Sequence, residues 1–427
     1  MHFITTMRAL GPRYLALWIG QTVSQFGTYI ALVTLPFLVQ HLQELKGEGT
    51  NLDLSVVYAL ETLPTVIVGL LGGALLDRWH LRPVMIATDL LRASAFFYLA
   101  GTVGEITIAG IYAFAFLIGS FTTLFDGALY SVIPALVDRS RLADANSFVA
   151  AVQQAMFSIG VLTGGVSFTM FDGPGAGLFI NGATFVVSAL SLYWVGRVPH
   201  HRKPEVERGA YLKEVVNGVR YIWREPRLRI TTMSAAIPNF VIGFVEATFV
   251  ALAEDVFKVE NKLQTGLLLG FLGVGGLIGA LTAPALTRKL GLGRTLTVGM
   301  AIAGTLMLCV MFTTYGAAAF ALQAGWMIGI SVVNIPMVAI RQHYADESML
   351  GTVITATRAI SWGSLPVGAL VGGWLGATEA TIPVVARVFP LLLIGTAVWL
   401  RTTVVWSDTF GPGFDDSGRP APESASR

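Results

Sequence analysis

The chain has 427 residues, of which 54% are apolar and only 13% are charged, and its mean hydropathy is +0.67. These figures exclude a disordered chain and an ordinary soluble protein, which would need far more polar surface. The 28 basic and 26 acidic residues nearly balance, which argues against a nucleic-acid-binding face, and the single cysteine, Cys309, excludes a disulfide scaffold.

Twelve mostly apolar stretches follow one another along the chain, and each is long enough to cross a bilayer as a helix. The first is too long for the core of a signal peptide, and the continuous apolar runs lack the alternation of a membrane β-barrel. We therefore predict an all-α membrane protein with twelve transmembrane helices in two six-helix halves. The predicted spans cover 14–40, 54–76, 83–102, 107–136, 146–170, 174–196, 230–254, 263–287, 294–313, 316–340, 349–376 and 380–402.

The longest polar segment, 197–229, separates the first six spans from the last six. We therefore expect an N-terminal half over 1–196, a central loop, a C-terminal half over 230–406 and a disordered tail over 407–427. When both termini are assigned to one side, 22 of the 28 Lys and Arg residues fall on that side and three on the other. By the positive-inside rule this predicts cytoplasmic termini and a place in the inner (plasma) membrane of the cell.

The central loop contains one helical pattern. Apolar residues at 212, 215, 216, 219, 222 and 223 form one face of a helix. Two placements follow: the helix lies flat on the inner membrane surface, or it packs against the inner ends of the bundle.

Glycines spaced by four residues recur in every third span, the second, fifth, eighth and eleventh. Some such pairs arise by chance among 47 glycines, but the regular placement favours a repeated unit of three helices. Small residues at this spacing let helix backbones approach closely, and such repeats are typical of secondary transporters. The predicted helix-packing residues are Gly69, Gly160, Gly164, Gly165, Gly275, Gly279, Gly368 and Gly372, with Gly73 closing the first pair.

The link after the second span reads Gly-Ala-Leu-Leu-Asp-Arg-Trp-His-Leu-Arg over 73–82. It resembles the signature loop of the major facilitator superfamily, G-x-L-x-D-R-x-G-R-R, with His80 at the second glycine and Leu81 at a basic position. The resemblance implies that Gly73, Asp77, Arg78 and Arg82 form a latch that holds the two halves shut on the cytoplasmic side. The alternative is that they are ordinary loop charges.

Three further segments resemble the drug:proton antiporter-3 branch of that superfamily, which contains macrolide and siderophore exporters. They are Trp-Ile-Gly-Gln-Thr-Val-Ser-Gln-Phe-Gly over 18–27, Ile-Pro-Ala-Leu-Val with Leu-Ala-Asp-Ala-Asn-Ser over 133–147, and Gly-Val-Arg-Tyr-Ile over 218–222. One departure argues against proton-coupled export: the antiporter pattern G-P-x-x-G-G has Val161 in place of its proline.

The resemblance implies a secondary active transporter that exports amphipathic small molecules, drug-like or siderophore-like, by proton antiport with alternating access. Its expected partners are a small-molecule substrate, protons and membrane lipid, without nucleic acid, and we expect a monomer. Two alternatives stay open, an uptake or lipid-moving carrier of the same fold and a transport-dead membrane receptor.

Ionisable side chains within the spans need an explanation, because one at the bilayer centre costs about 2.5–3.5 kcal/mol on insertion scales. Glu61, Asp126 and Glu246 are candidates for proton coupling, since burial favours the protonated form of a carboxyl group in general. Solvation at the outer interface is the alternative for Glu61. For Asp126 the alternative is an ion pair with Arg358 or with another cation. Asp89 and Arg92 lie one turn apart and are expected to pair with each other.

Other polar residues interrupt apolar runs and are candidates for lining a substrate cavity. They are Gln21, Gln25, Asn239, Asn334 and Arg358. For Gln21, Gln25 and Asn334 the alternative is hydrogen bonding to each other. For Arg358 three roles stay open: a counter-ion, a contact to an anionic substrate, or a contact between helices. The sequence has no phosphate-binding G-x-x-x-x-G-K-[ST] run, and its six histidines do not cluster. We therefore expect neither a cofactor nor a metal site, and no enzyme activity.

Overall fold

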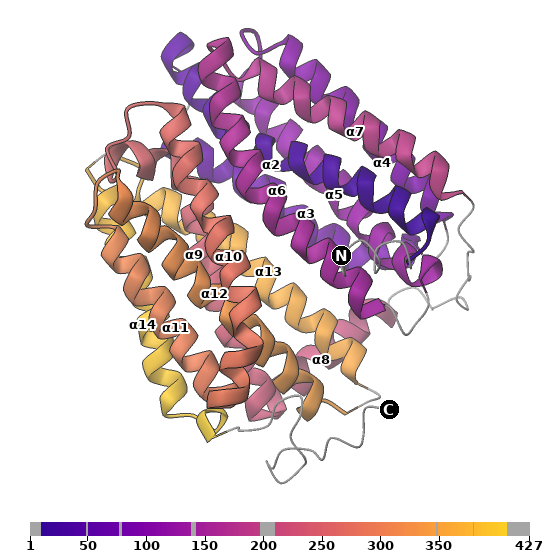
Figure 1. Cartoon of the computed structure of the whole chain (residues 1–427), viewed down its shortest axis with the longest axis vertical. Coiled ribbons are helices and arrows are strands. Elements are labelled where there is room, and N and C mark those ends of the chain that lie inside the picture. Colours follow the sequence, from indigo (N-terminus) through magenta and orange to yellow (C-terminus); the bar gives the residue numbers. More distant parts are fainter. Residues whose placement is uncertain are drawn as a thin grey trace.

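The computed structural model describes residues 10–47, 50–76, 79–137, 142–196, 210–346, 349–378 and 380–407. Within these segments the regular structure is entirely helical, and twelve of the helices have 19 or more residues. The prediction of an all-α protein with two six-helix halves is confirmed (Figure 1). Within the described residues, ten of the twelve are long and apolar enough to cross a membrane by length and composition. The other two long helices are α3 and α13.

The helices of the two halves follow in chain order. The N-terminal half contains α2 (Pro12–Lys46), α3 (Asn51–Leu76), α4 (Leu81–Gly101), α5 (Ile108–Leu136), α6 (Leu142–Phe171) and α7 (Gly175–Val195). After α8 (Ala210–Arg224), the C-terminal half contains α9 (Pro226–Asp255), α10 (Lys262–Leu290), α11 (Leu292–Val310), α12 (Ala317–Tyr344), α13 (Leu350–Leu375) and α14 (Ile382–Arg401).

Successive long helices run in opposite directions, so the bundle has two ends (Figure 1). We call the end that carries α8 the α8 end, and the other the opposite end. Several helices extend past the predicted spans, because hydropathy marks the apolar stretch and not the helix. The first helix continues to Lys46 and ends where Gly47 adopts the left-handed conformation (φ 70°) that glycine tolerates.

The recurrent glycines lie where helices pack most closely. An added Cβ atom would lie 2.6 Å from the Tyr29 Cβ at Gly160, on the α6 face toward α2. It would lie 2.1 Å from the Ala324 carbonyl oxygen at Gly275, between α10 and α12. It would lie 1.9 Å from the Phe240 carbonyl oxygen at Gly368, between α13 and α9.

The second glycine of each pair faces the same neighbouring helix as the first. Added Cβ atoms would lie 2.3 Å from Val33 at Gly164, 2.6 Å from Ser331 at Gly279 and 2.2 Å from the Phe244 ring at Gly372. Gly165 instead faces the other half, with the Lys262 carbonyl oxygen 2.6 Å away. The surroundings of Gly69 and Gly73 lie outside the described residues.

The two halves meet mainly through two helix pairs, α3 with α13 and α6 with α10 (Figure 1). The apolar core of the C-terminal half extends across this boundary, because Val33, Phe37 and Val161 of the N-terminal half pack into it. This shared core brings α2 and α6 against α9 and α10. A separate small cluster of Ala59, Ala247 and Ala369 packs α3 against α9 and α13.

The structure favours the second placement of the amphipathic helix. α8 packs on α13, where Ile222 is fully buried in a cluster with Val353 and Ala356. Close approach depends on Gly218, whose added Cβ atom would lie 2.9 Å from the Thr352 carbonyl oxygen. Val216 is exposed on the same helix. α8 is therefore attached to the C-terminal half through part of its apolar face.

The C-terminal half ends in a short 3₁₀ helix, η2 (Val404–Ser407). It packs beside Gly293, and the guanidinium groups of Arg294 and Arg401 both lie 5.8 Å from the Trp406 ring centroid. The remainder of the predicted tail, 408–427, lies outside the described residues.

Candidate functional site

A cavity of about 500 Å³ lies between the halves and is lined by α3, α9, α12 and α13. It extends along α12 from Met327 to Arg341, which lies one turn before the end of that helix at the α8 end. Most of its wall is apolar. The ionisable and amide groups on its wall are few: Tyr58, Asn239, Glu246, Asn334, Arg341 and Arg358.

A second, smaller cavity of about 260 Å³ lies between α2, α6, α9, α10 and α12. Tyr29, Gln154, Glu246 and Trp326 contribute its polar groups. The two cavities share Glu246, with Ile242 and Met327, as a common wall. Glu246 is therefore reached from both compartments.

The carboxylate of Glu246 is bound by the opposite half of the protein. The hydroxyl of Tyr58, on α3, donates a hydrogen bond to the Glu246 Oε2 atom on α9. Glu61, one turn from Tyr58, lies within electrostatic range of Glu246 but lines neither cavity. Two carboxyl groups and a phenol thus lie within electrostatic range of one another where the halves join.

Asp126 belongs to a separate group of charges inside the N-terminal half. It lies within electrostatic range of both Arg92 and Arg358 and lines neither cavity. The expected pair of Arg92 with Asp89 forms, at 2.5 Å, and both side chains are at most 3% exposed. The Arg92 guanidinium also lies 4.5 Å and 4.2 Å from the ring centroids of Phe125 and Phe185.

Arg358 connects this charge group to the central cavity. Its side chain lines the cavity, and its guanidinium lies 5.7 Å from the ring centroid of Tyr130 on α5 and 5.4 Å from that of Trp362. Both rings can hold the cation by cation–π attraction. Arg358 therefore links the two halves at the wall of the cavity.

Four of the eight residues predicted for proton coupling or the cavity are brought together: Asn239, Asn334, Glu246 and Arg358. The other four, Gln21, Gln25, Glu61 and Asp126, are not among the residues lining either cavity. Gln21 is buried in α2, and its amide nitrogen has no hydrogen-bond partner in the described part of the chain. The apolar residues around Gln21 do not indicate which face of the helix points toward a cavity.

Part of the signature loop can be placed. The Arg82 Nε atom donates to the Leu192 carbonyl at 2.8 Å, and its Nη2 atom donates to the Tyr193 carbonyl at 3.3 Å. Both acceptors lie in the last turn of α7, in the same half, and the Tyr193 carbonyl also accepts from the backbone N–H of Gly196. Asp77 and Arg78 lie outside the described residues, so the latch stays a prediction.

A polar cluster at the opposite end of the bundle has no counterpart among the sequence predictions. The Lys262 Nζ atom donates to the Glu254 Oε1 atom at 2.6 Å and also to the Gln40 side-chain oxygen. The Gln40 amide in turn donates to the Glu254 Oε2 atom at 3.0 Å. Gln40 belongs to α2, so this cluster joins the halves on the far side of Glu246 from Arg341.

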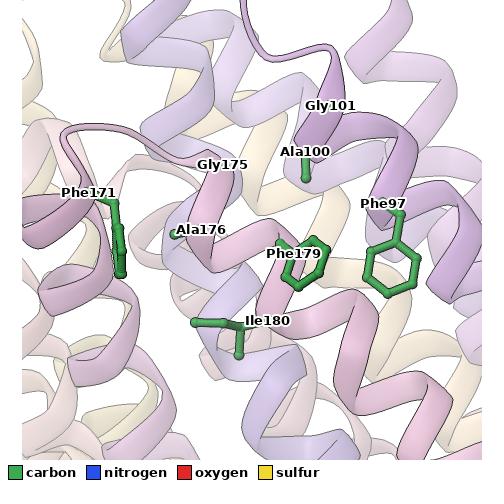
Figure 2. A pocket seen from close by; sticks show the side chains of 8 residues that line it. All are labelled: Phe97, Ala100, Gly101, Phe171, Gly175, Ala176, Phe179 and Ile180. Carbon is green, nitrogen blue, oxygen red and sulfur yellow. The ribbon is translucent and has the colours of Figure 1, made fainter.

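A wider recess of about 620 Å³ lies on the outside of the N-terminal half, between α4, α6 and α7 (Figure 2). Its walls carry apolar side chains and glycines only, including Phe97, Phe171 and Phe179. Phe171 and Phe179 are more than half exposed, as expected of a surface that faces lipid. Among the described residues none offers this recess a polar side chain to orient a ligand, so the central cavity is the candidate site.

Twelve long apolar helices in two halves around a central cavity define a multi-pass membrane protein with the fold of a secondary transporter. Residues 17–369 match the model of the Major Facilitator Superfamily, and the chain belongs to that family. Members of this superfamily are carriers, so the protein is a transporter and not an enzyme.

Several relatives are similar along much of the chain. The multidrug efflux pump Tap of Mycolicibacterium fortuitum is 26% identical over 91% of this chain and 96% of its own length. Macrolide efflux protein A of Streptococcus pyogenes is 21% identical over 62% of this chain and 66% of its own length. The crystal structure of a mutant of the nucleoside transporter NupG has a TM-score of 0.76 at 13% identity, covering 91% of this chain and 98% of that chain.

Proposed function

We propose that the protein exports amphipathic small molecules by proton antiport, with Glu246 as the proton-coupling residue. The observation that carries this proposal is the position of Glu246, on the wall of both cavities and hydrogen-bonded to the other half. Charged carboxylates are costly in a membrane interior. A proton on Glu246 removes that cost, so protonation and closure of the site around it are energetically linked.

The cavity supports an amphipathic substrate. Its wall is mainly apolar, from Ile330, Met337 and Trp362 among others, and a few polar groups converge on it. Such a combination is typical of small-molecule sites, where apolar surface supplies affinity and polar groups orient the ligand. The names of the relatives Tap and macrolide efflux protein A favour export over uptake.

The orientation is part of the proposal. Basic residues concentrate on the side of the termini, which favours a cytoplasmic α8 end and a place in the inner membrane of the cell. The cavity then reaches toward the cytoplasm at Arg341, while Gln40, Glu254 and Lys262 close the opposite end. This is the conformation that loads a substrate for export. The latch of Gly73, Asp77, Arg78 and Arg82 would act in the other conformation.

The test is proton release from the purified protein in detergent on addition of a panel of lipophilic drugs and siderophores. We expect ligand-induced release in the natural protein, its loss in Glu246→Gln, and its retention in Asp126→Asn and in the exposed control Glu44→Gln. Loss in Asp126→Asn alone would reassign the coupling role. Binding without release in every variant would overturn proton antiport and favour a uniporter or a transport-dead receptor.

Direction is tested separately, in proteoliposomes with an imposed pH gradient. Substrate moving against the proton flow supports export by antiport. Substrate moving with the protons would instead indicate an uptake carrier of the same fold, and movement of fluorescent phospholipid alone would indicate a lipid-moving carrier.

A further inference from the structure

Two arginine side chains line the central cavity, Arg341 from α12 and Arg358 from α13. The Arg341 Nη2 atom donates to the Thr231 carbonyl of α9 at 3.2 Å. On the next residue of α9, the Thr232 hydroxyl lies 3.3 Å from the hydroxyl of Thr357, the neighbour of Arg358. Arg341 and Arg358 thus approach the cavity from α12 and α13 beside the same turn of α9.

Arg341 lacks the compensation that a buried cation requires. Its side chain is partly buried, and its buried Nε atom has no hydrogen-bond partner within the described part of the chain. Among the described residues Arg341 forms no ion pair, and its guanidinium donates one hydrogen bond, to a neutral carbonyl. A buried, unpaired charge is costly and is usually matched by a partner or a ligand.

The carboxylate on the same cavity wall is too far away to supply that match. Thr231 and Glu246 are 15 residues apart on α9, which corresponds to about 22 Å along the helix axis. This separation exceeds the distance over which charges in contact with water interact strongly. The cavity is therefore polarised along its length, with a carboxyl group near the centre of the bundle and two guanidinium groups toward the α8 end.

Arg358 is better compensated but remains available. It lies within electrostatic range of Asp126, and its guanidinium is held beside the rings of Tyr130 and Trp362. Asp126 also lies within electrostatic range of Arg92, which forms its own ion pair with Asp89. The Arg358 side chain is exposed on the cavity wall. A planar guanidinium in that position can offer paired N–H donors to a carboxylate or phosphate group.

We infer that Arg341 and Arg358 form an anion subsite at the α8 end of the cavity, and that the transported molecule is an amphipathic anion. Its carboxylate, sulfonate or phosphate group contacts the two arginines, and its apolar body extends along Ile330, Met337 and Trp362 toward Glu246. This inference rests on the proposed function, because it assumes that the central cavity is the substrate path. It adds the charge of the substrate, which the fold alone does not supply.

The test compares three dansyl probes that share one fluorescent body. Dansylglycine carries a carboxylate, dansylglycinamide is neutral, and dansylcadaverine carries an amine. Binding to the full chain in phosphatidylcholine nanodiscs is measured by fluorescence enhancement over empty nanodiscs. A charge-assisted contact predicts that the acid binds roughly tenfold to a hundredfold more tightly than the amide, and that the amine binds weakly.

Four variants assign the preference to residues. Arg341→Gln and Arg358→Gln should each reduce the acid-over-amide preference about tenfold, while Arg341→Lys should retain most of it. The control is Arg387→Gln, which removes an intramembrane arginine held against Phe312, away from the cavity, and should leave the preference unchanged. If Arg341→Gln does not fold, Arg358→Gln carries the test, because its side chain is exposed.

Equal binding of acid and amide by the natural protein would overturn the inference, and so would a preference that survives both glutamine substitutions. Two sources of the anion are separated by adding phosphatidylglycerol to the nanodiscs. Competition by this lipid at the arginines assigns the subsite to a lipid headgroup, and undiminished dansylglycine binding assigns it to a free amphipathic anion. These binding measurements do not depend on transport. A charge preference without proton release would contradict proton antiport and support the anion subsite. Proton release without a charge preference would support proton antiport and contradict the anion subsite.

Discussion

The hydroxyl of Tyr58 donates a hydrogen bond to the carboxylate of Glu246, and these two residues belong to opposite halves of the protein. The contact sits where the two central cavities meet. It therefore exists only while α3 and α9 are close together at this level. The bond therefore couples the protonation of the Glu246 carboxyl group to the relative position of the two halves.

Removing this bond should change the balance between conformations. Tyr58→Phe deletes the hydroxyl and keeps the ring, so the present conformation loses a bond to a charged group worth about 1.5–3 kcal/mol. If the bond is absent from the other conformation, the equilibrium shifts by roughly tenfold or more. Spin labels at Trp194→Cys and Arg288→Cys, both at the α8 end, would report a larger population of short distances once Cys309 is replaced.

The control for that substitution is Tyr98→Phe, on a largely exposed side chain of α4. Its distance distribution should match that of the natural residue. An unchanged distribution in Tyr58→Phe would mean that the bond forms in both conformations or contributes nothing to the choice between them.

Gln40 should stabilise the closed opposite end. Gln40→Ala removes both inter-half hydrogen bonds and leaves the ion pair of Lys262 with Glu254 within the C-terminal half. Because Glu254 is partly exposed, each lost bond is worth about 0.5–1.5 kcal/mol, so opening should increase severalfold. A thiol at Val161→Cys, buried between the halves, should then react faster with a charged maleimide, whereas the exposed control Gln43→Ala should leave its rate unchanged.

Two glycines of one helix should differ sharply in their tolerance of a methyl group. In Gly368→Ala the new Cβ atom would lie 1.9 Å from the Phe240 carbonyl oxygen, so α13 and α9 must move apart. Overpacking of this kind costs about 1–3 kcal/mol, which should lower the thermal unfolding midpoint in detergent. In Gly363→Ala the nearest atom, on Val66, is 3.5 Å away, and alanine favours the helix. A midpoint equal in both variants would contradict the tight packing described for Gly368.

Burial along α8 predicts another contrast within one helix. Ile222 is fully buried against α13, whereas Val216 is 55% exposed. Ile222→Ala should therefore cost about 2–5 kcal/mol of local stability, and Val216→Ala should cost little. Hydrogen exchange of the α8 amides is the measurement, and similar protection in the two variants would mean that α8 does not rest on α13.

Helix number and order could be predicted from hydropathy, because a chain in lipid must satisfy its backbone hydrogen bonds within each span. Four cavity residues could be predicted for a related reason: polar groups in apolar runs are costly and call for a partner. The same rule also selected Gln21 and Gln25, which lie on α2 away from the cavities. The spacing of residues along one helix shows which of them share a face, but it does not show which neighbouring helix that face contacts.

The contacts between the halves could not be predicted. Tyr58 and Glu246 are 188 residues apart, and Gln40 and Glu254 are 214 apart, so no local pattern connects them. Arg341 looked like an ordinary basic residue at a helix end. Its importance follows only from its depth beside Thr231 and from the absence of an acidic partner in the described part of the chain.

The packing of α8 on α13 determines where the polypeptide can be divided. Since α8 packs on the C-terminal half, the covalent link between the two halves lies before Ala210 and not after Arg224. Two coexpressed fragments divided before Ala210 would keep each half complete. A division after Arg224 would leave α8 on the N-terminal fragment, separated from the half on which it packs. A reporter domain inserted before Ala210 would accordingly lie between the two halves. A reporter inserted within α8 would move together with the C-terminal half.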